Sequence, residues 1–372
     1  MGVTRYPHGY IPLAGDRGWN TRASRCHPDL PPIRHDGGVP HTLSRALEAV
    51  LDGLPAEPLR RATASLIDAY RSGAPPTAQL LRDPTTAAAY AAYRMPATYA
   101  AVSRALRHAT ELAPALEVRT LLDVGGGTGA ATWAAVEAFP SLEGATVLDG
   151  SADALALGAR VGRHGPPPVA GASWSRVLLG PGTALPAAEL VVASYLLGEL
   201  AGPLRLAVVD AAVGAASRLV LVVEPGTPRG YAAVLAARSR LTAAGWHVLA
   251  PCPQDGACPV AAREGDWCHF AVRLDRSALH RRVKGGRLGH EDEKFSYVLA
   301  SREPLPRAGA RVLRHPVTRK GLVQLELCDS AGSAQRVVVT RRDPIAYRAA
   351  RDASWGSPWP APGPEPRTDV GL

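Results

Sequence analysis

The sequence is poor in cysteine, in lysine and in long apolar runs. It has five cysteines and three lysines among 372 residues. No apolar run reaches the roughly 18 residues that a membrane-spanning helix needs, so we expect no membrane partner. The N-terminus lacks the charged-then-apolar pattern of a secretion signal. We therefore expect a cytoplasmic protein, in a reducing compartment where grouped cysteines bind metal more often than they form disulfides.

Positive charge is concentrated in one part of the chain. The formal net charge is +9, and 46% of the residues are hydrophobic. Between Arg263 and Arg351 there are 19 basic and 10 acidic residues, which accounts for the whole excess. All three lysines, Lys284, Lys294 and Lys320, lie in this window. The concentration favours an anionic partner, most simply nucleic acid, and the alternative is a solvated basic face.

Composition and periodicity divide the chain into five stretches. We expect a disordered leader, a helical region, an α/β core, a module of cysteines and basic strands, and a tail, at residues 1–41, 42–115, 116–250, 251–345 and 346–372. Pro96 lies inside the helical region and predicts a break near Met95.

The core alternates short aliphatic segments with helical ones. The segments that predict strands are TLLDV, ATVLD, LVVAS and RLVLVVE, with GWHVLAP and KFSYVLASR as later strands of the same sheet. Near-continuous apolar strands between helices indicate a parallel sheet covered on both faces. We therefore predict an α/β fold with a Rossmann-like sheet, an N-terminal helical region and a C-terminal cysteine-cluster and small β module.

A glycine loop follows the first of these strands. Asp123 closes the strand, and Gly125, Gly127 and Gly129 alternate before a helix begins. Glycines let a ligand approach the backbone closely, and the helix N-terminus adds aligned N–H groups. The pattern resembles the S-adenosylmethionine site of class I methyltransferases. Gly125, Gly127 and Ala130 also satisfy the dinucleotide fingerprint, so a dinucleotide is the alternative ligand.

Two later strand ends add to this predicted site. Asp149 ends the second strand, where a carboxylate can accept hydrogen bonds from ribose hydroxyls; the alternative is a surface residue that begins a turn. Ser194 ends the strand LVVAS, and we include it among the cofactor-binding residues. Tyr195 and Glu199 are candidates to shape an acceptor pocket or are ordinary loop residues. The core has neither an Asn- or Asp-Pro-Pro-aromatic motif nor a cysteine, and we identify no catalytic base.

Four of the five cysteines lie in the last third of the chain: Cys252, Cys258, Cys268 and Cys328. Their spacings are C-x5-C, x9-C and x59-C, without the paired C-x2-C knuckles of zinc ribbons. Four converging thiolates suit a 4Fe–4S cluster, and structural zinc is the alternative. His269 is a substitute zinc ligand, and Cys26 is far from the others. Between the third and fourth cysteines a basic stretch predicts phosphate contacts, through Arg273, Arg276, Arg281, Arg282, Lys284 and Arg287.

Several long motifs together resemble one family. They are YRMPATYAAV, VEPGTPRGY, DWCHF, HRRVKGGRLGHEDEKFSYVLASR, RKGLVQLELC and WGSPWP, within a stretch from about Thr42 to Pro360. These motifs are similar to those of the mitoribosomal small-subunit assembly, methyltransferase-like family of the Rsm-twenty-two type, and we expect a bacterial member.

The resemblance implies a class I fold that binds S-adenosylmethionine and a four-cysteine iron–sulfur site on the cysteines named above. It also implies association with the small ribosomal subunit and its 16S rRNA. Two functions stay open under it: methyl transfer in ribosome assembly or translation, or non-catalytic assembly. A third alternative is a small-molecule methyltransferase with a zinc-stabilised domain. The acceptor atom and the oligomeric state are not fixed by the sequence.

Overall fold

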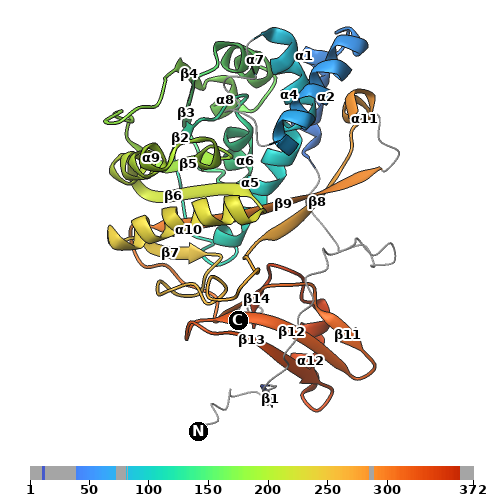
Figure 1. Cartoon of the computed structure of the whole chain (residues 1–372), viewed down its shortest axis with the longest axis vertical. Coiled ribbons are helices and arrows are strands. Elements are labelled where there is room, and N and C mark those ends of the chain that lie inside the picture. The colour runs from blue at the N-terminus through green and yellow to red at the C-terminus, as the bar shows by residue number, and fades with distance from the viewer. Residues whose placement is uncertain (1–10, 13–38, 73–80, 82, 285–288, 361–372) are drawn as a thin grey trace, which may run out of the picture. The chain divides into compact units, whose positions relative to one another are not determined.

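The computed structural model describes residues 11–12, 39–72, 81, 83–284 and 289–360 (Figure 1). These residues divide into two compact units. The sheet unit comprises Pro32–Pro251 and Trp267–Leu305, and the small unit comprises Met1–Pro31, Cys252–Asp266 and Pro306–Leu372, each as far as it is described. Most of the predicted leader, and residues 361–372 of the predicted tail, lie outside the described residues.

Among its described residues, the predicted helical region forms four helices of the sheet unit: α1 (His41–Leu51), α2 (Ala56–Ser72), α4 (Pro84–Tyr93) and α5 (Met95–Thr110). Asp83 caps α4, because its Oδ1 accepts hydrogen bonds from the N–H groups of Thr85 and Thr86 at 2.8 and 3.0 Å. Pro96 lies in the first turn of α5, where its missing N–H costs no hydrogen bond. The predicted break at Met95 is therefore confirmed. None of the described helices has the length and apolarity that crossing a bilayer requires.

The central sheet of this unit has the strand order β4-β3-β2-β5-β6-β9-β7, with β8 paired to β9. Its strands are β2 (Thr120–Val124), β3 (Gly144–Asp149), β4 (Ser173–Arg176), β5 (Ala188–Ser194), β6 (Ala216–Pro225), β7 (His247–Ala250), β8 (Phe270–Asp275) and β9 (His290–Ser301). Strands β2 to β6 pair in parallel, whereas β9 runs antiparallel to both β6 and β7. All six predicted strands are present. Sequence reasoning missed β4, because SWSR is short and largely exposed.

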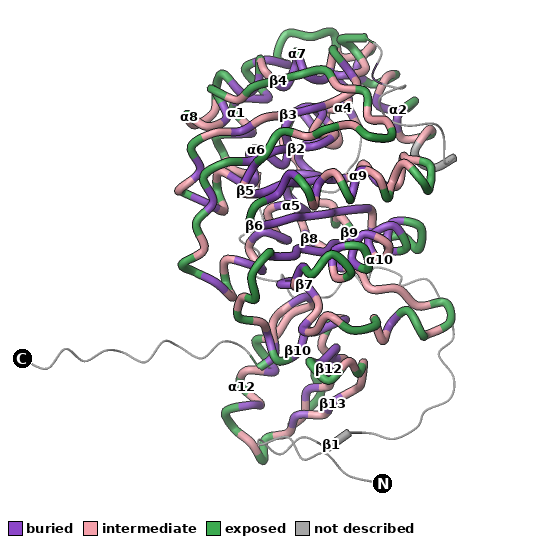
Figure 2. The backbone as a smooth tube through the Cα atoms, turned by 90° about the vertical axis from the view of Figure 1, so that its left-hand side faces the viewer, coloured by how far each residue is buried: buried purple, intermediate pink, exposed green. Residues whose placement is uncertain are grey.

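Helices connect the parallel strands and cover both faces of the sheet (Figures 1 and 2). The connecting helices are α6 (Ala130–Ala138), α7 (Ala152–Gly162), α8 (Pro167–Ala170), α9 (Gly202–Ala215) and α10 (Pro228–Ala243). The order runs from β2 through β3 to β4 on one side and from β5 to β6 on the other. Because parallel crossovers are right-handed, this reversal places α6 and α9 on opposite faces. The reversal also creates a switch point between β2 and β5, where such sheets bind ligands.

The β8–β9 hairpin belongs to the sheet unit rather than to a separate module. Phe270 pairs with Phe295 and Asp275 with His290, and the second half of β9 continues between β6 and β7. Helix α11 (Ala278–Lys284) lies between the two strands of the hairpin. The units therefore divide residues 251–345 differently from the boundaries predicted by composition, because continuous strand pairing joins 267–305 to the core.

The described part of the small unit contains a second sheet and one helix. Its strand order is β1-β13-β12-β10-β14, with β11 paired to β12. The elements are β1 (Ile11–Pro12), β10 (Ala310–Val312), β11 (Val317–Arg319), β12 (Leu322–Asp329), β13 (Ala334–Thr340), α12 (Pro344–Asp352) and β14 (Pro358–Trp359). Alternation along β12 and β13 buries Val323, Leu325, Val337 and Val339 in one core with Trp359. The antiparallel pairing predicted for this part of the chain is confirmed.

The start of α10 gives a test of the packing. A Cβ at Gly230 would lie 2.1 Å from the carbonyl oxygen of Pro225, a backbone atom that cannot easily move. A Cβ at Gly214, near the end of α9, would meet nothing within 4 Å. We expect Gly230→Ala to lower the free energy of unfolding by about 1–3 kcal/mol, as overpacking does. Gly214→Ala should leave it unchanged or raise it by up to about 1 kcal/mol, because alanine favours helix. Urea denaturation measures both, and equal effects would contradict the packing at Gly230.

Candidate functional site

The glycine loop between β2 and α6 has a left-handed backbone at three positions. The angle φ is 67° at Gly125, 54° at Gly127 and 83° at Gly129. Residues with a Cβ are strained there. The N–H of Gly126 donates to the carbonyl oxygen of Leu148 at 3.1 Å, which ties the loop to β3. The alternation seen in the sequence is therefore a requirement of this backbone.

Neighbouring side chains also crowd an added Cβ at three loop positions, although not at Gly127, where the nearest atom would be Asp149 Oδ2 at 3.8 Å. At Gly125 a Cβ would lie 2.7 Å from Leu196 Cδ1, and at Gly126 it would lie 2.5 Å from Asp123 Cγ. At Gly129 the obstacle is the Trp174 ring, at 2.6 Å. Side chains larger than hydrogen at Gly125, Gly126 and Gly129 would therefore require their neighbours to move.

Asp149, the last residue of β3, joins this loop to the start of α7. Its Oδ2 accepts a hydrogen bond from the N–H of Gly127 at 2.9 Å, and its Oδ1 accepts one from the N–H of Ser151 at 2.7 Å. Burial raises the pKa of Asp149, and the same two N–H groups oppose that rise. Each carboxylate oxygen keeps a second lone pair, so the group can also accept hydrogen bonds from ribose hydroxyls.

A pocket of about 690 Å³ lies at the carboxyl ends of β2, β3, β5 and β6. This is the edge at which open α/β sheets bind ligands, and the volume lies in the range of small-molecule sites. Four of the six residues predicted to bind the cofactor line the pocket, namely Gly125, Gly127, Asp149 and Ser194. The structure therefore brings together residues from three predicted strand ends.

Asp123 and Gly129, the other two predicted residues, do not line this pocket. Asp123 is fully buried, and its Oδ2 accepts a hydrogen bond from Thr132 Oγ1 at 3.2 Å. Its Oδ1 has no hydrogen-bond partner within the described part of the chain. Burial raises the pKa of Asp123 to about 7, although the bond from Thr132 opposes the rise. Asp123 therefore supports the loop from beneath.

Tyr195, Arg94 and Glu293 form one connected group in the pocket wall. Tyr195 has a φ of 56°, and its hydroxyl donates to Glu293 Oε1 at 2.7 Å. Arg94 makes two hydrogen bonds of 3.1 Å to the Glu293 carboxylate, and its guanidinium carbon lies 5.1 Å from the centre of the Tyr195 ring. Burial and the charge of Glu293 raise the pKa of Tyr195 well above its usual value, so the phenol stays protonated. Sequence reasoning missed Arg94 and Glu293, although they lie in the motifs YRMPATYAAV and HRRVKGGRLGHEDEKFSYVLASR, because both motifs are far from Tyr195 in the sequence.

Glu224, near the end of β6, fixes the segment that follows β5. Its Oε1 accepts from the N–H of Leu197 at 2.7 Å, and its Oε2 accepts from the N–H of Gly198 at 3.1 Å. Burial raises the pKa of Glu224 to about 7 against the effect of these bonds. The side chain lines the pocket, as does that of Glu199. Glu224 was not predicted, although it lies in the motif VEPGTPRGY that carried the family resemblance.

Most of the basic side chains predicted to contact phosphate are engaged within the sheet unit. Arg276 Nη2 and Lys284 Nζ lie 3.0 and 2.6 Å from Glu291 Oε2. The other ion pairs of this group are Arg273 with Asp292 and Arg282 with Asp52. Arg281 is exposed, and Arg287 lies outside the described residues. The stretch therefore presents much less unbalanced positive charge than its sequence suggests.

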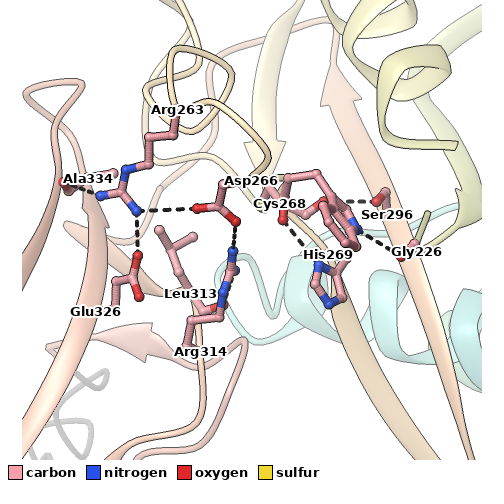
Figure 3. Close-up of polar contacts among 11 residues, drawn as sticks. Gly226, Arg263, Asp266, Cys268, His269, Ser296, Leu313, Arg314, Glu326 and Ala334 are labelled. Atoms are coloured by element: carbon pink, nitrogen blue, oxygen red, sulfur yellow. Dashed lines mark hydrogen bonds and ion pairs between the residues drawn. The ribbon is translucent and has the colours of Figure 1, made fainter. Parts of the chain in front are cut away.

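The segment that carries Cys252 and Cys258 is tied to the second sheet of the small unit. Arg263 donates to the carboxylate of Glu326 on β12 and, at 2.6 Å, to the carbonyl oxygen of Ala334 (Figure 3). Asp266 forms an ion pair with Arg314. The same unit contains Cys328, near the end of β12. Three of the four cysteines predicted to bind metal therefore belong to one unit.

Cys268 belongs to the sheet unit, where its backbone is fixed locally. Its carbonyl oxygen accepts a hydrogen bond from Ser296 Oγ at 2.8 Å, and the indole N–H of neighbouring Trp267 donates to the carbonyl oxygen of Gly226 at 2.9 Å. The ring of His269 stacks on that of Trp267 with centroids 5.3 Å apart. The structure gives Cys252, Cys258, Cys268 and Cys328 as thiols, and Cys26 lies outside the described residues. Among the described residues no group of three or more His, Cys, Asp or Glu is arranged to hold a metal ion.

Strand order and site together define the class of protein. Three features are those of class I methyltransferase-like proteins, as expected from the sequence. They are a parallel sheet with the antiparallel strand β9 between β6 and β7, a glycine loop after β2, and a carboxylate at the end of β3. A family model described as mitochondrial small ribosomal subunit Rsm22 matches residues 84–360, and the chain belongs to this family.

Two relatives illustrate the match. The chain is 30% identical over 286 residues to the human protein "Ribosome assembly protein METTL17, mitochondrial", a match that covers 72% of this chain and 61% of that protein. It is 26% identical over 186 residues to "Rsm22-cox11 tandem protein 2, mitochondrial" of Schizosaccharomyces pombe, covering 39% of this chain and 25% of that protein. The chain therefore spans less than two thirds of the length of either relative.

Solved structures with a similar fold include two methyltransferases. One is the precorrin-6y C5,15-methyltransferase of Geobacter metallireducens, with 13% identity, a TM-score of 0.34, and coverage of 52% of this chain and 85% of that one. The other is the magnesium protoporphyrin IX methyltransferase of Synechocystis, solved with bound SAM, with 13% identity, a TM-score of 0.32, and coverage of 53% and 76%.

The buried carboxyl of Asp123 predicts a pH-dependent stability. Its folded pKa of about 7 exceeds the ordinary value of 3.8, so folding favours the neutral acid. Stability from this group is therefore complete below about pH 4 and is lost as the pH rises through about 7, at roughly 1.4 kcal/mol per unit of pKa difference. We expect Asp123→Asn to gain stability relative to the unsubstituted protein between pH 5 and pH 8. Thermal melts across this range measure the difference, with exposed Asp68→Asn as control. A difference that stays constant with pH would contradict the assignment.

Proposed function

We propose that this protein is an S-adenosylmethionine-dependent methyltransferase-like factor that acts on the small ribosomal subunit and its 16S rRNA, in ribosome assembly or translation. The observation that carries the cofactor part is the pocket at the switch point of the sheet, with Asp149 and the glycine loop in its wall. The ribosomal part is supported by membership of the Rsm22 family and by the name of the human relative, a ribosome assembly protein. A cytoplasmic location is part of the proposal.

The residues present fit this cofactor. Gly125 and Gly127 line the pocket without a side chain of their own, and Asp149 keeps lone pairs for the ribose hydroxyls. Four carboxyl groups line the pocket, those of Asp149, Glu199, Glu224 and Glu293, and they outnumber its two guanidinium groups, those of Arg94 and Arg229. A wall of this kind suits the positive sulfonium centre of S-adenosylmethionine. The cofactor supplies an activated methyl group, and the contribution of this chain is to hold and orient the cofactor and the acceptor.

A non-catalytic assembly factor with the same pocket is the second candidate, and one observation favours it. The polar groups that wall the pocket beside Ser194 already bind one another, because Tyr195 donates to Glu293 and Arg94 pairs with the same carboxylate. None of these three groups is therefore poised as a base for an acceptor. Methyl transfer by this chain would therefore depend on holding the acceptor close to the methyl group of the cofactor. Such proximity contributes a large share of the rate enhancement in well-oriented reactions.

Calorimetry with S-adenosylmethionine tests the cofactor part. Asp149→Ala should weaken binding by about one to three kcal/mol, because hydrogen bonds to a charged acceptor are lost. Asp153→Ala is the matched control, since this side chain lies in the first turn of α7 outside the pocket. Equal affinities of Asp149→Ala and the control would remove Asp149 from the site.

Transfer of labelled methyl groups to immature small-subunit particles separates the two candidates. Incorporation into 16S rRNA that Asp149→Ala abolishes would support the enzyme. Tight cofactor binding without incorporation would favour the assembly factor. Absence of binding both to the cofactor and to the particles would overturn both.

We further propose that Cys252, Cys258, Cys268 and Cys328 bind a 4Fe–4S cluster, with zinc as the alternative. Donor chemistry supports this, since four thiols form the soft ligand set that both metal centres use and a reducing compartment preserves. The cluster would hold its cysteine-bearing segments in place, and no step of methyl transfer is assigned to it.

Anaerobic purification with iron, sulfide and zinc analysis tests the cysteine proposal. We expect about four irons and four sulfides per chain, lost in Cys252→Ser and retained in Cys26→Ser. One zinc and no iron would replace the cluster with a structural zinc site. Protein without metal, or equal metal content in both variants, would contradict the proposed ligands.

A further inference from the structure

Some basic side chains of the small unit form ion pairs and others do not. Arg263, Arg307 and Arg314 form ion pairs, with Glu326, Asp255 and Asp266. Arg348 and Arg351 on α12 are exposed and take part in no ion pair within the described part of the chain, and the same holds for four residues outside that helix: Arg319, Lys320, Arg341 and Arg342. We call these four residues the basic tip.

The fold gathers the basic tip at one end of the second sheet. Arg319 is the last residue of β11 and pairs with Leu322, and Leu322 pairs in turn with Thr340 at the end of β13. The N–H of Arg341 donates to the carbonyl oxygen of Gly321 at 3.2 Å, so the β11–β12 turn lies directly beside residues 341–342. Gly321 has a φ of 82°, which lets the chain turn sharply there. Two basic pairs that are about twenty residues apart in sequence thereby become neighbours.

The surroundings of the tip select what it can bind. The acidic residue next in the chain, Asp343, is half-buried and caps α12 through its Oδ1 and the N–H of Ala346 at 2.9 Å. The guanidinium of Arg341 lies 5.7 Å from the centre of the Tyr347 ring and occupies a face that a base would need for stacking. The tip therefore offers cationic donors for phosphates without a platform for bases.

We propose that the basic tip contacts the sugar–phosphate backbone of folded RNA. Phosphate contacts position a protein without reading sequence, and they need exposed Arg and Lys whose charge no internal partner neutralises. The tip meets this condition, whereas most of the basic side chains between Arg273 and Arg287 are held in ion pairs. The inference rests on the proposed function only in taking small-subunit rRNA as the partner.

Salt-dependent binding of the full chain to a 16S rRNA transcript tests the proposal. The two tip variants are Arg319→Gln with Lys320→Gln and Arg341→Gln with Arg342→Gln. Each removes two phosphate contacts and should reduce the slope of log K against log salt by about 1.5, which corresponds to roughly 30-fold weaker binding at 0.1 M salt. Arg160→Gln with Arg163→Gln removes the same charge from exposed positions of the sheet unit and should change the slope much less. All substituted side chains are exposed, so melting temperatures should stay unchanged.

The outcomes distinguish this proposal from the proposed function. If both tip variants show the same slope of log K against log salt as the unsubstituted protein, the basic tip does not contact RNA. The proposed ribosomal role would not be affected by that result. Equal loss in the tip variants and the control would also overturn the contact by the basic tip, because net charge alone would then explain binding. Polyglutamate that competes as well as RNA at equal charge would reassign the surface to an acidic protein. No rRNA binding by the unsubstituted protein would instead count against the proposed partner.

Discussion

The carboxylate of Asp149 accepts hydrogen bonds from two backbone segments, which follow the neighbouring strands β2 and β3. Without it, the N–H of Gly127 in the glycine loop and the N–H of Ser151 at the start of α7 would lose their acceptor. The glycine loop has little freedom to compensate, because Leu196, Asp123 and Trp174 surround it closely. The shape of the pocket therefore depends on the same group that we propose to bind the cofactor.

Carboxylates recur at the other strand ends that form the pocket. Glu224 binds two backbone N–H groups of the segment after β5, much as Asp149 does for the glycine loop. Glu293, from the antiparallel strand β9, binds Tyr195 and Arg94. Insertion of β9 between β6 and β7 is thus what brings a carboxylate from the far part of the chain into the pocket wall. The result is a pocket that suits a positively charged ligand and whose polar groups are largely committed to one another.

The positive charge of the chain has two distinct uses. In the β8–β9 hairpin and its helix, cations surround Glu291 and Asp292 and stabilise the hairpin where it leaves the main sheet. In the small unit, Arg263 and Arg314 tie the cysteine-bearing segment to β12 and its neighbours, while the basic tip keeps its charge exposed. The basic stretch therefore contains two kinds of cation. Some form internal ion pairs that stabilise the fold, and those of the basic tip remain exposed to a partner.

The sequence by itself determined six strands of the main sheet, the glycine loop, the break at Pro96 and the family, because apolar periodicity, glycine spacing and proline act locally. It also singled out Asp149, Gly125, Gly127 and Ser194, which line the pocket, since each lies at or just after a recognisable strand end. Only the tertiary structure decided that Asp123 lies beneath the loop, that Arg94 and Glu293 meet Tyr195, and that the β8–β9 hairpin belongs to the main sheet. It also decided which arginines remain exposed. These outcomes depend on pairings between residues far apart in the chain, where burial and ion pairing select among partners that composition leaves equivalent.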